Sequence, residues 1–69
     1  MERKEELKEA VERLSEQEFE RLQLLKKIAS IVEQADMGEI NSMPTLYRLE
    51  IKKALEELGN QHAASRIKT

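Results

Sequence analysis

The sequence predicts an all-α protein, a small helical hairpin or bundle of three to four helices that is completed by oligomerisation. Glu, Lys, Leu and Ala are abundant, proline occurs once and glycine twice, and the strand-favouring valine and threonine occur only twice each. Apolar residues recur at spacings of three and four, as they do on one face of a helix. The predicted helices span about residues 2–14, 16–35, 44–58 and 60–67, with a loop at 36–43.

The length and the lack of cysteine limit how such a chain is stabilised. Its 69 residues make one domain, residues 1–69. A chain of this size buries only roughly 60% of the surface that it exposes when unfolded. Without cysteine there is no disulfide and none of the common structural zinc sites. Oligomerisation or a bound partner is the remaining common route to stability.

The first helix has a narrow apolar face and is followed by a helix-start signal. That face consists of Leu7, Ala10, Val11 and Leu14. Residues 15–18, Ser-Glu-Gln-Glu, fit a capping box in which the Ser15 hydroxyl accepts a hydrogen bond from a helical N–H, and Leu14 with Phe19 fits the matching hydrophobic staple. These signals favour a bend at Ser15, and the alternative is one continuous helix over residues 2–35, about 50 Å long.

Residues 22–35 are the most apolar part of the chain. Two neighbouring stripes together exceed the roughly 100° that an ordinary surface helix buries, so this helix must be covered on two sides. The helix at 44–58 can cover one stripe and the first helix part of the other, so the sequence predicts one unpaired seam that binds a partner. This seam is centred on Leu25, Ala29 and Val32 or on Ile28 and Ile31. The predicted partner-binding residues are Leu22, Leu25, Ile28, Ala29, Ile31 and Val32.

The second half of the chain contains start and stop signals for two more helices. Gly38 is placed to end the preceding helix, Pro44 suits the first turn of the next, and Gly59 closes that helix so that Asn60 can cap a short last one. The apolar residues expected to face the core from the helix at 44–58 are Leu46, Leu49, Ile51, Leu55 and Leu58, with Tyr47 and Ala54 beside them.

No constellation of residues indicates catalysis, a cofactor or a metal. The acidic side chains alternate with lysines and arginines on solvated faces, whereas acid–base catalysis needs carboxyls in distinct environments. His62 is the only histidine, and two glycines cannot build a phosphate-binding loop. We therefore expect a non-enzymatic protein with no cofactor.

Residues 51–67 resemble the opening of the helix-turn-helix in Fis-type DNA-binding domains. The resemblance rests on Ala54-Leu55, Gly59-Asn60 and Ala63-Ala64 and covers about 17 of the 69 residues. It implies a sharp turn at the glycine and a close helix crossing at the alanines. In that family a recognition helix follows, and this chain stops at Thr69, before such a helix could form.

Positive charge in the second half of the chain could contact nucleic acid. The candidate residues are Arg48, Lys52, Lys53, Arg66 and Lys68. They are diluted by Glu50, Glu56 and Glu57, and the sequence pI of about 5.4 is far from the basic value typical of a DNA-binding domain.

These observations favour a small protein–protein interaction module, such as an adaptor, inhibitor or regulatory subunit, that acts through the helix at 22–35. Its partner would be a second copy in a homodimer or another protein. The alternative is a DNA-binding transcriptional regulator with a partial helix-turn-helix in residues 44–69. The densely charged first residues and the lack of a long apolar run favour a cytoplasmic location without membrane contact.

Overall fold

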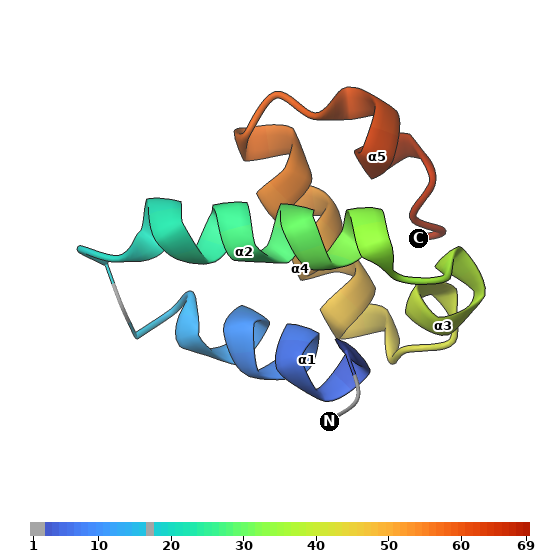
Figure 1. Cartoon of the computed structure of the whole chain (residues 1–69), viewed down its shortest axis with the longest axis horizontal. Coiled ribbons are helices and arrows are strands. Elements are labelled where there is room, and N and C mark those ends of the chain that lie inside the picture. Colours follow the sequence, from blue (N-terminus) through green and yellow to red (C-terminus); the bar gives the residue numbers. More distant parts are fainter. Residues whose placement is uncertain (1–2, 17) are drawn as a thin grey trace.

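The computed structural model describes residues 3–16 and 18–69, and these residues form five helices and no strand (Figure 1). The helices are α1 (Arg3–Arg13), α2 (Arg21–Gln34), α3 (Met37–Asn41), α4 (Thr45–Glu57) and α5 (Gln61–Ser65). The all-α prediction is thereby confirmed.

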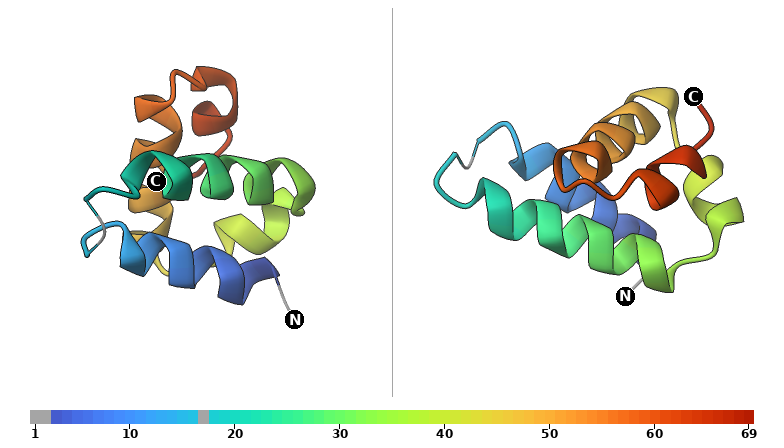
Figure 2. Two further views of the ribbon diagram at one scale, coloured as in Figure 1. Left: turned by 60° about the vertical axis from the view of Figure 1, so that its left-hand side comes forward. Right: turned by 90° about the horizontal axis from the view of Figure 1, so that it is seen from above.

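The long helices α1 and α2 form an antiparallel hairpin, and α4 crosses it. Figures 1 and 2 show α1 and α2 side by side, with α4 running steeply across them and packed against both. The short helix α5 packs against α4, while α3 makes the corner between α2 and α4. The C-terminus lies near α3.

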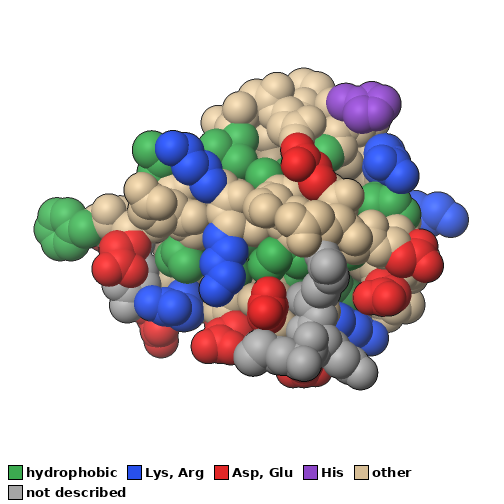
Figure 3. Space-filling view, viewed as in Figure 1, with side chains coloured by type: hydrophobic (Ala, Val, Ile, Leu, Met, Phe, Trp, Pro, Cys, Tyr) green, Lys and Arg blue, Asp and Glu red, His purple; other side chains and the backbone are tan. Residues whose placement is uncertain are grey.

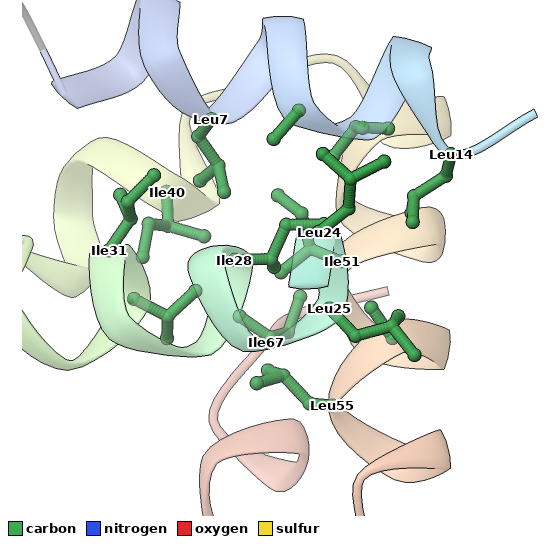
Figure 4. Packing of buried hydrophobic residues seen from close by; sticks show 14 of the residues in the cluster. Leu7, Leu14, Leu24, Leu25, Ile28, Ile31, Ile40, Ile51, Leu55 and Ile67 are labelled. Atoms are coloured by element: carbon green, nitrogen blue, oxygen red, sulfur yellow. The ribbon is translucent and has the colours of Figure 1, made fainter. Parts of the chain in front are cut away.

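One apolar core joins all five helices and the segment after α5. Side chains from α1, α2, α3, α4 and the C-terminal segment converge around Ile28 and Ile51, neither of which exposes any surface (Figure 4). Among the described residues no polar or charged side chain is buried. The core residues are Leu7, Ala10, Val11, Leu14, Leu24, Leu25, Ile28, Ile31, Val32, Ile40, Met43, Ile51, Ala54, Leu55, Ala64 and Ile67.

The bend after α1 is confirmed, but the predicted start of the second helix is wrong. The second helix begins at Arg21 rather than residue 16. The Ser15 hydroxyl donates to the Glu12 carbonyl at 3.1 Å, so it closes the end of α1 instead of capping a new helix. The staple does not form, because Leu14 is buried in the core while Phe19 is fully exposed. Gln17, within the predicted capping box, lies outside the described residues.

The predicted loop at 36–43 contains a helix. Ala35 adopts an extended conformation and ends α2, and the Asp36 carboxylate then caps α3 by accepting a hydrogen bond from the Gly38 N–H at 2.9 Å. Gly38 thus lies inside α3 instead of ending the previous helix. Ile40 and Met43 point into the core, which is why this short segment folds back onto the hairpin.

The helix predicted at 44–58 is present as α4, but two of its expected core residues face outward. Pro44 precedes its first turn, and Ile51 and Leu55 are buried. Leu46 is 76% exposed and Leu49 39% exposed. At about 100° per residue, these two leucines lie roughly 140–160° around the helix from Ile51, so they cannot share its buried side.

The end of the chain follows the sequence prediction closely. Gly59 has φ of +79°, the left-handed conformation that glycine adopts most easily after a helix. The Asn60 side chain caps α5 by accepting a hydrogen bond from the Ala63 N–H at 3.2 Å. The last helix ends at Ser65 instead of residue 67, because Ile67 turns away to reach the core.

A bidentate ion pair links the first turn of α2 to the last turn of α4. Arg21 donates from Nη2 to Glu57 Oε1 at 2.6 Å and from Nε to Oε2 at 3.3 Å. The hydrogen bond from Arg21, with its charge, lowers the pKa of Glu57 below the ordinary carboxyl value. Both side chains are partly exposed, so the pair orients the two helices more than it stabilises them.

Replacing Leu55 by alanine should destabilise the fold by about 2–5 kcal/mol, because the side chain is wholly buried and its removal leaves a cavity. Leu46→Ala is the matched control, and its exposed position should limit the change to about 0.5 kcal/mol. Denaturant unfolding measures both values. Equal destabilisation by the two substitutions would contradict the assignment of buried and exposed sides of α4.

Arg21→Gln should raise the pKa of Glu57 toward its ordinary value. Because the folded-state pKa is lowered, the pair stabilises the fold above the unfolded carboxyl pKa, and that contribution is lost as pH falls through the folded-state pKa. An NMR titration of the Glu57 carboxyl carbon in both proteins measures the change. Identical titration curves would show that the ion pair does not form in solution.

Candidate functional site

The structure places most of the predicted partner-binding residues in the chain's own core. Leu25, Ile28, Ile31 and Val32 are buried, and Ala29 packs against the core. Only Leu22, at 53% exposed, remains largely accessible. The predicted unpaired seam is therefore absent from the surface of the folded chain. The apolar surface of α2 that was predicted to be unpaired is covered by α3, by the crossing helix α4 and by Ile67.

The large apolar side chains that remain exposed among the described residues lie in two places. Phe19 lies just before α2 and is 104% exposed, and Leu22 lies at the beginning of α2 and is 53% exposed. Leu46 and Leu49 lie one turn apart on α4. On the face drawn in Figure 3, hydrophobic side chains form small separate areas between charged groups.

The outward side of α4 is a regular helical surface with leucines at one end and charges at the other. We define the outer face of α4 as Leu46, Leu49, Lys53 and Glu56, which follow a spacing of three, four and three and are all exposed. Glu50 flanks this face and approaches Lys53 at 3.9 Å between Oε1 and Nζ. The apolar part is thus bordered by charges of both signs.

The candidate nucleic-acid residues are only partly brought together. Arg48, Lys52 and Lys68 lie around the C-terminal segment, where Lys52 Nζ is 3.5 Å from the Thr69 hydroxyl. Lys53 belongs to the outer face of α4 instead. Arg66 is one of the residues that line a groove beside α2. The five cations therefore do not form one basic surface.

The Arg48 side chain forms its hydrogen bonds within the fold. Its guanidinium donates to the Met43 carbonyl at 3.0 Å, to the Thr45 hydroxyl at 2.8 Å and to the Lys68 carbonyl at 2.9 Å. These bonds use three of the five N–H donors of the guanidinium and fix its position within the fold. Its role is to hold the start of α4 and the C-terminal segment together.

Asn41 completes this arrangement, which we name the C-terminal clamp (Asn41 and Arg48). The Asn41 amide nitrogen donates to the Arg66 carbonyl at 3.3 Å, and its oxygen accepts from the Lys68 N–H at 2.8 Å. Between these two bonds Ile67 inserts into the core at 2% exposed. Sequence reasoning missed the clamp, because nothing near Asn41 indicates a contact with residues 25 and 27 positions further on.

Tyr47 forms a second polar link between distant helices. Its hydroxyl donates to Glu12 Oε2 at 2.7 Å, and Lys8 Nζ lies 5.6 Å from the ring centroid. The hydrogen bond to Glu12 raises the pKa of Tyr47. These contacts fix α4 against α1 and create no enclosed reactive group.

One concave feature of the surface is a groove of about 170 Å³ between the C-terminal end of α2 and α5. Its lining residues are Val32, Glu33, Met37, Asn60, His62, Ala63 and Arg66. Among the described residues no cluster of three or more His, Asp or Glu side chains could hold a metal ion. None of the described helices has the length and apolar character needed to cross a membrane.

Comparison with protein-family models, with curated proteins and with solved structures finds no match to this chain. The local features implied by the Fis-type resemblance are present, because α4, the turn at Gly59 and α5 follow one another and Ala64 is buried at 1% exposed. These features resemble one supersecondary motif of that family. No family follows from it.

Replacing Asn41 by alanine should loosen the C-terminal segment by removing the acceptor of the Lys68 N–H. Amide hydrogen exchange at Lys68 should accelerate about fivefold, the effect of losing one hydrogen bond of average net strength. Ser42→Ala is the control, because the Ser42 hydroxyl bonds only the local Glu39 carbonyl. Unchanged exchange at Lys68 in Asn41→Ala would contradict the clamp.

Proposed function

We propose that this chain is a small non-enzymatic protein–protein interaction module that acts through the outer face of α4. The observation that supports this proposal is the exposure of Leu46 and Leu49, which lie one turn apart on α4. The opposite side of this helix is buried in the core. Two exposed leucines on a rigid helix are typical anchors for a partner groove or a partner helix. The proposed partner is a second copy or another protein, in the cytoplasm.

The energetics of this face define how large the interface must be. Burying the exposed parts of the two leucines contributes on the order of 2–3 kcal/mol. Association costs at least about 4 kcal/mol in lost translational and rotational freedom. The partner must therefore also contact the charges that border the leucines, and Lys53 and Glu56 on the same face provide both signs.

The nucleic-acid alternative has weaker support. Arg48 uses three of its N–H donors inside the fold, Lys53 pairs with Glu50, and Arg66 lines the groove beside α2. Lys52 and Lys68 are too few to give the phosphate contacts on which non-specific affinity depends.

The proposal predicts that a double substitution, Leu46→Glu with Leu49→Glu, abolishes association. Sedimentation equilibrium from micromolar to submillimolar concentration should show a species larger than the 8.0 kDa chain if the partner is a second copy. If the partner is another protein, the immobilised wild-type chain should retain that protein from an extract of the native source. The immobilised double variant should not retain it. Both substitutions lie on the exposed side, so circular dichroism should be unchanged.

Leu22→Glu is the matched control, because it adds the same charge at an exposed leucine outside α4. Association that survives the double substitution but not Leu22→Glu would move the interface to the start of α2. A wild-type chain that stays monomeric, and retains the same proteins as the double variant, would refute the proposal.

A further inference from the structure

The segment that follows α5 is held against the rest of the fold by few groups. We name residues 66–69 the C-terminal strap. Ile67 is buried in the core, whereas the other three residues of the strap are exposed. The hydrogen bonds that join the strap backbone to α3 and α4 come from the two side chains of the C-terminal clamp. One buried side chain and the clamp therefore hold the strap in place.

The helix before the strap has its own anchors. The Asn60 side chain caps α5, Ala64 is 1% exposed, and α5 packs against α4. The Ile67 N–H donates to the Ala64 carbonyl at 3.2 Å, which closes the last turn of α5 and does not reach another element. Segments with few apolar contacts and exposed hydrogen bonds open locally while the rest of a protein stays folded. The strap meets both conditions, and α5 can stay docked without it.

The guanidinium of the clamp is positioned by groups outside the strap. Arg48 Nε donates to the Met43 carbonyl at 3.0 Å, and Nη2 donates to the Thr45 hydroxyl at 2.8 Å. Nη1 donates to the Lys68 carbonyl at 2.9 Å, and this is the Arg48 bond that a departing strap breaks. Because the guanidinium is planar, the two other bonds keep Nη1 aimed at the same place. The clamp therefore stays formed when the strap leaves.

The contacts of the strap show which chemistry this place accepts. Asn41 binds the Arg66 carbonyl and the Lys68 N–H, two backbone groups on either side of Ile67, and Arg48 binds the Lys68 carbonyl. Every peptide carries such backbone groups, so these contacts recognise a backbone conformation and not a sequence. The residue between them is selected by burial, because Ile67 is 2% exposed within the core cluster (Figure 4). The place thus accepts an aliphatic residue between two exposed neighbours.

We propose that the C-terminal strap is releasable and that its release opens a binding site for a peptide segment of a partner protein with an aliphatic residue at its centre. The C-terminal clamp binds the backbone of that segment, and the aliphatic side chain enters the core position that Ile67 leaves. The strap is then an internal competitor of the partner. It lowers the apparent affinity by the fraction of molecules in which it is open.

Hydrogen exchange of the wild-type full chain, followed by NMR at a series of low guanidinium concentrations, tests the release. The Lys68 amide should exchange at a rate that hardly changes with guanidinium, because a local opening exposes little surface. The Ile51 amide in the middle of α4, whose side chain is wholly buried, should exchange faster as guanidinium rises, because it is released by global unfolding. Equal slopes for the two amides would overturn the proposal.

Two capped tripeptides and the full chain with Ile67→Gly test the site. Acetyl-Arg-Ile-Lys-amide copies residues 66–68 and should shift the side-chain amide signals of Asn41 in a saturable way. Its affinity for Ile67→Gly should be about tenfold or more above that for the wild type, where the strap competes. Acetyl-Arg-Ser-Lys-amide has the same charge and should bind roughly tenfold more weakly, because no aliphatic side chain is buried.

Adding Asn41→Ala to Ile67→Gly should weaken binding of the Ile peptide by about fivefold or more, the effect of losing a hydrogen bond of average net strength. Adding Ser42→Ala is the matched control and should change nothing, because the Ser42 hydroxyl donates to the local Glu39 carbonyl. Equal binding of the two peptides, or of the Ile peptide to both chains, would refute the site. If circular dichroism shows Ile67→Gly unfolded, the exchange slopes of the wild type decide. No measurement involves the exposed leucines of α4, so the two proposals fail separately.

Discussion

The whole structure depends on covering α2 from more than one direction. Its apolar residues extend around more of the helix than a single neighbour can bury, and Ile28 at its centre exposes no surface at all. The hairpin partner α1 provides one contact, and α4 provides another by crossing the hairpin rather than extending it. The corner helix α3 and Ile67 close the remaining openings. The short helix α5 packs against α4 and leads to Ile67, which enters the same core.

The parts of this fold that could be predicted from sequence are those with a local physical cause. The all-α class, the ends of α4, the left-handed turn at Gly59 and the cap at Asn60 all follow from residues within a few positions of the feature. The capping box at residues 15–18 also had a local cause, and it failed because the Ser15 hydroxyl has a competing local acceptor at the end of α1. A serine near a helix boundary fits both arrangements.

The candidate sites were harder to predict, because exposure is a property of packing and not of residue type. Leucines at 46 and 49 and at 25 are chemically the same, yet only the buried one lies on the side that a neighbouring helix covers. The polar contacts that organise the fold join residues far apart in sequence: Tyr47 with Glu12, Arg21 with Glu57, and Asn41 with Lys68. Spacing along one sequence contains no signal for such pairs, so neither the clamp nor the groove could be inferred from it.

The C-terminal clamp has a consequence for the synthesis of this protein. A ribosome delivers α1 and α2 first, when the surface of Leu25 and Val32 has nothing to cover it, and Ile67 enters the core only after nearly every other residue has left the exit tunnel. Native packing is therefore completed after translation of residues 66–68 and not during it. Until the later elements pack, the nascent hairpin exposes apolar side chains of α2 that the folded protein buries.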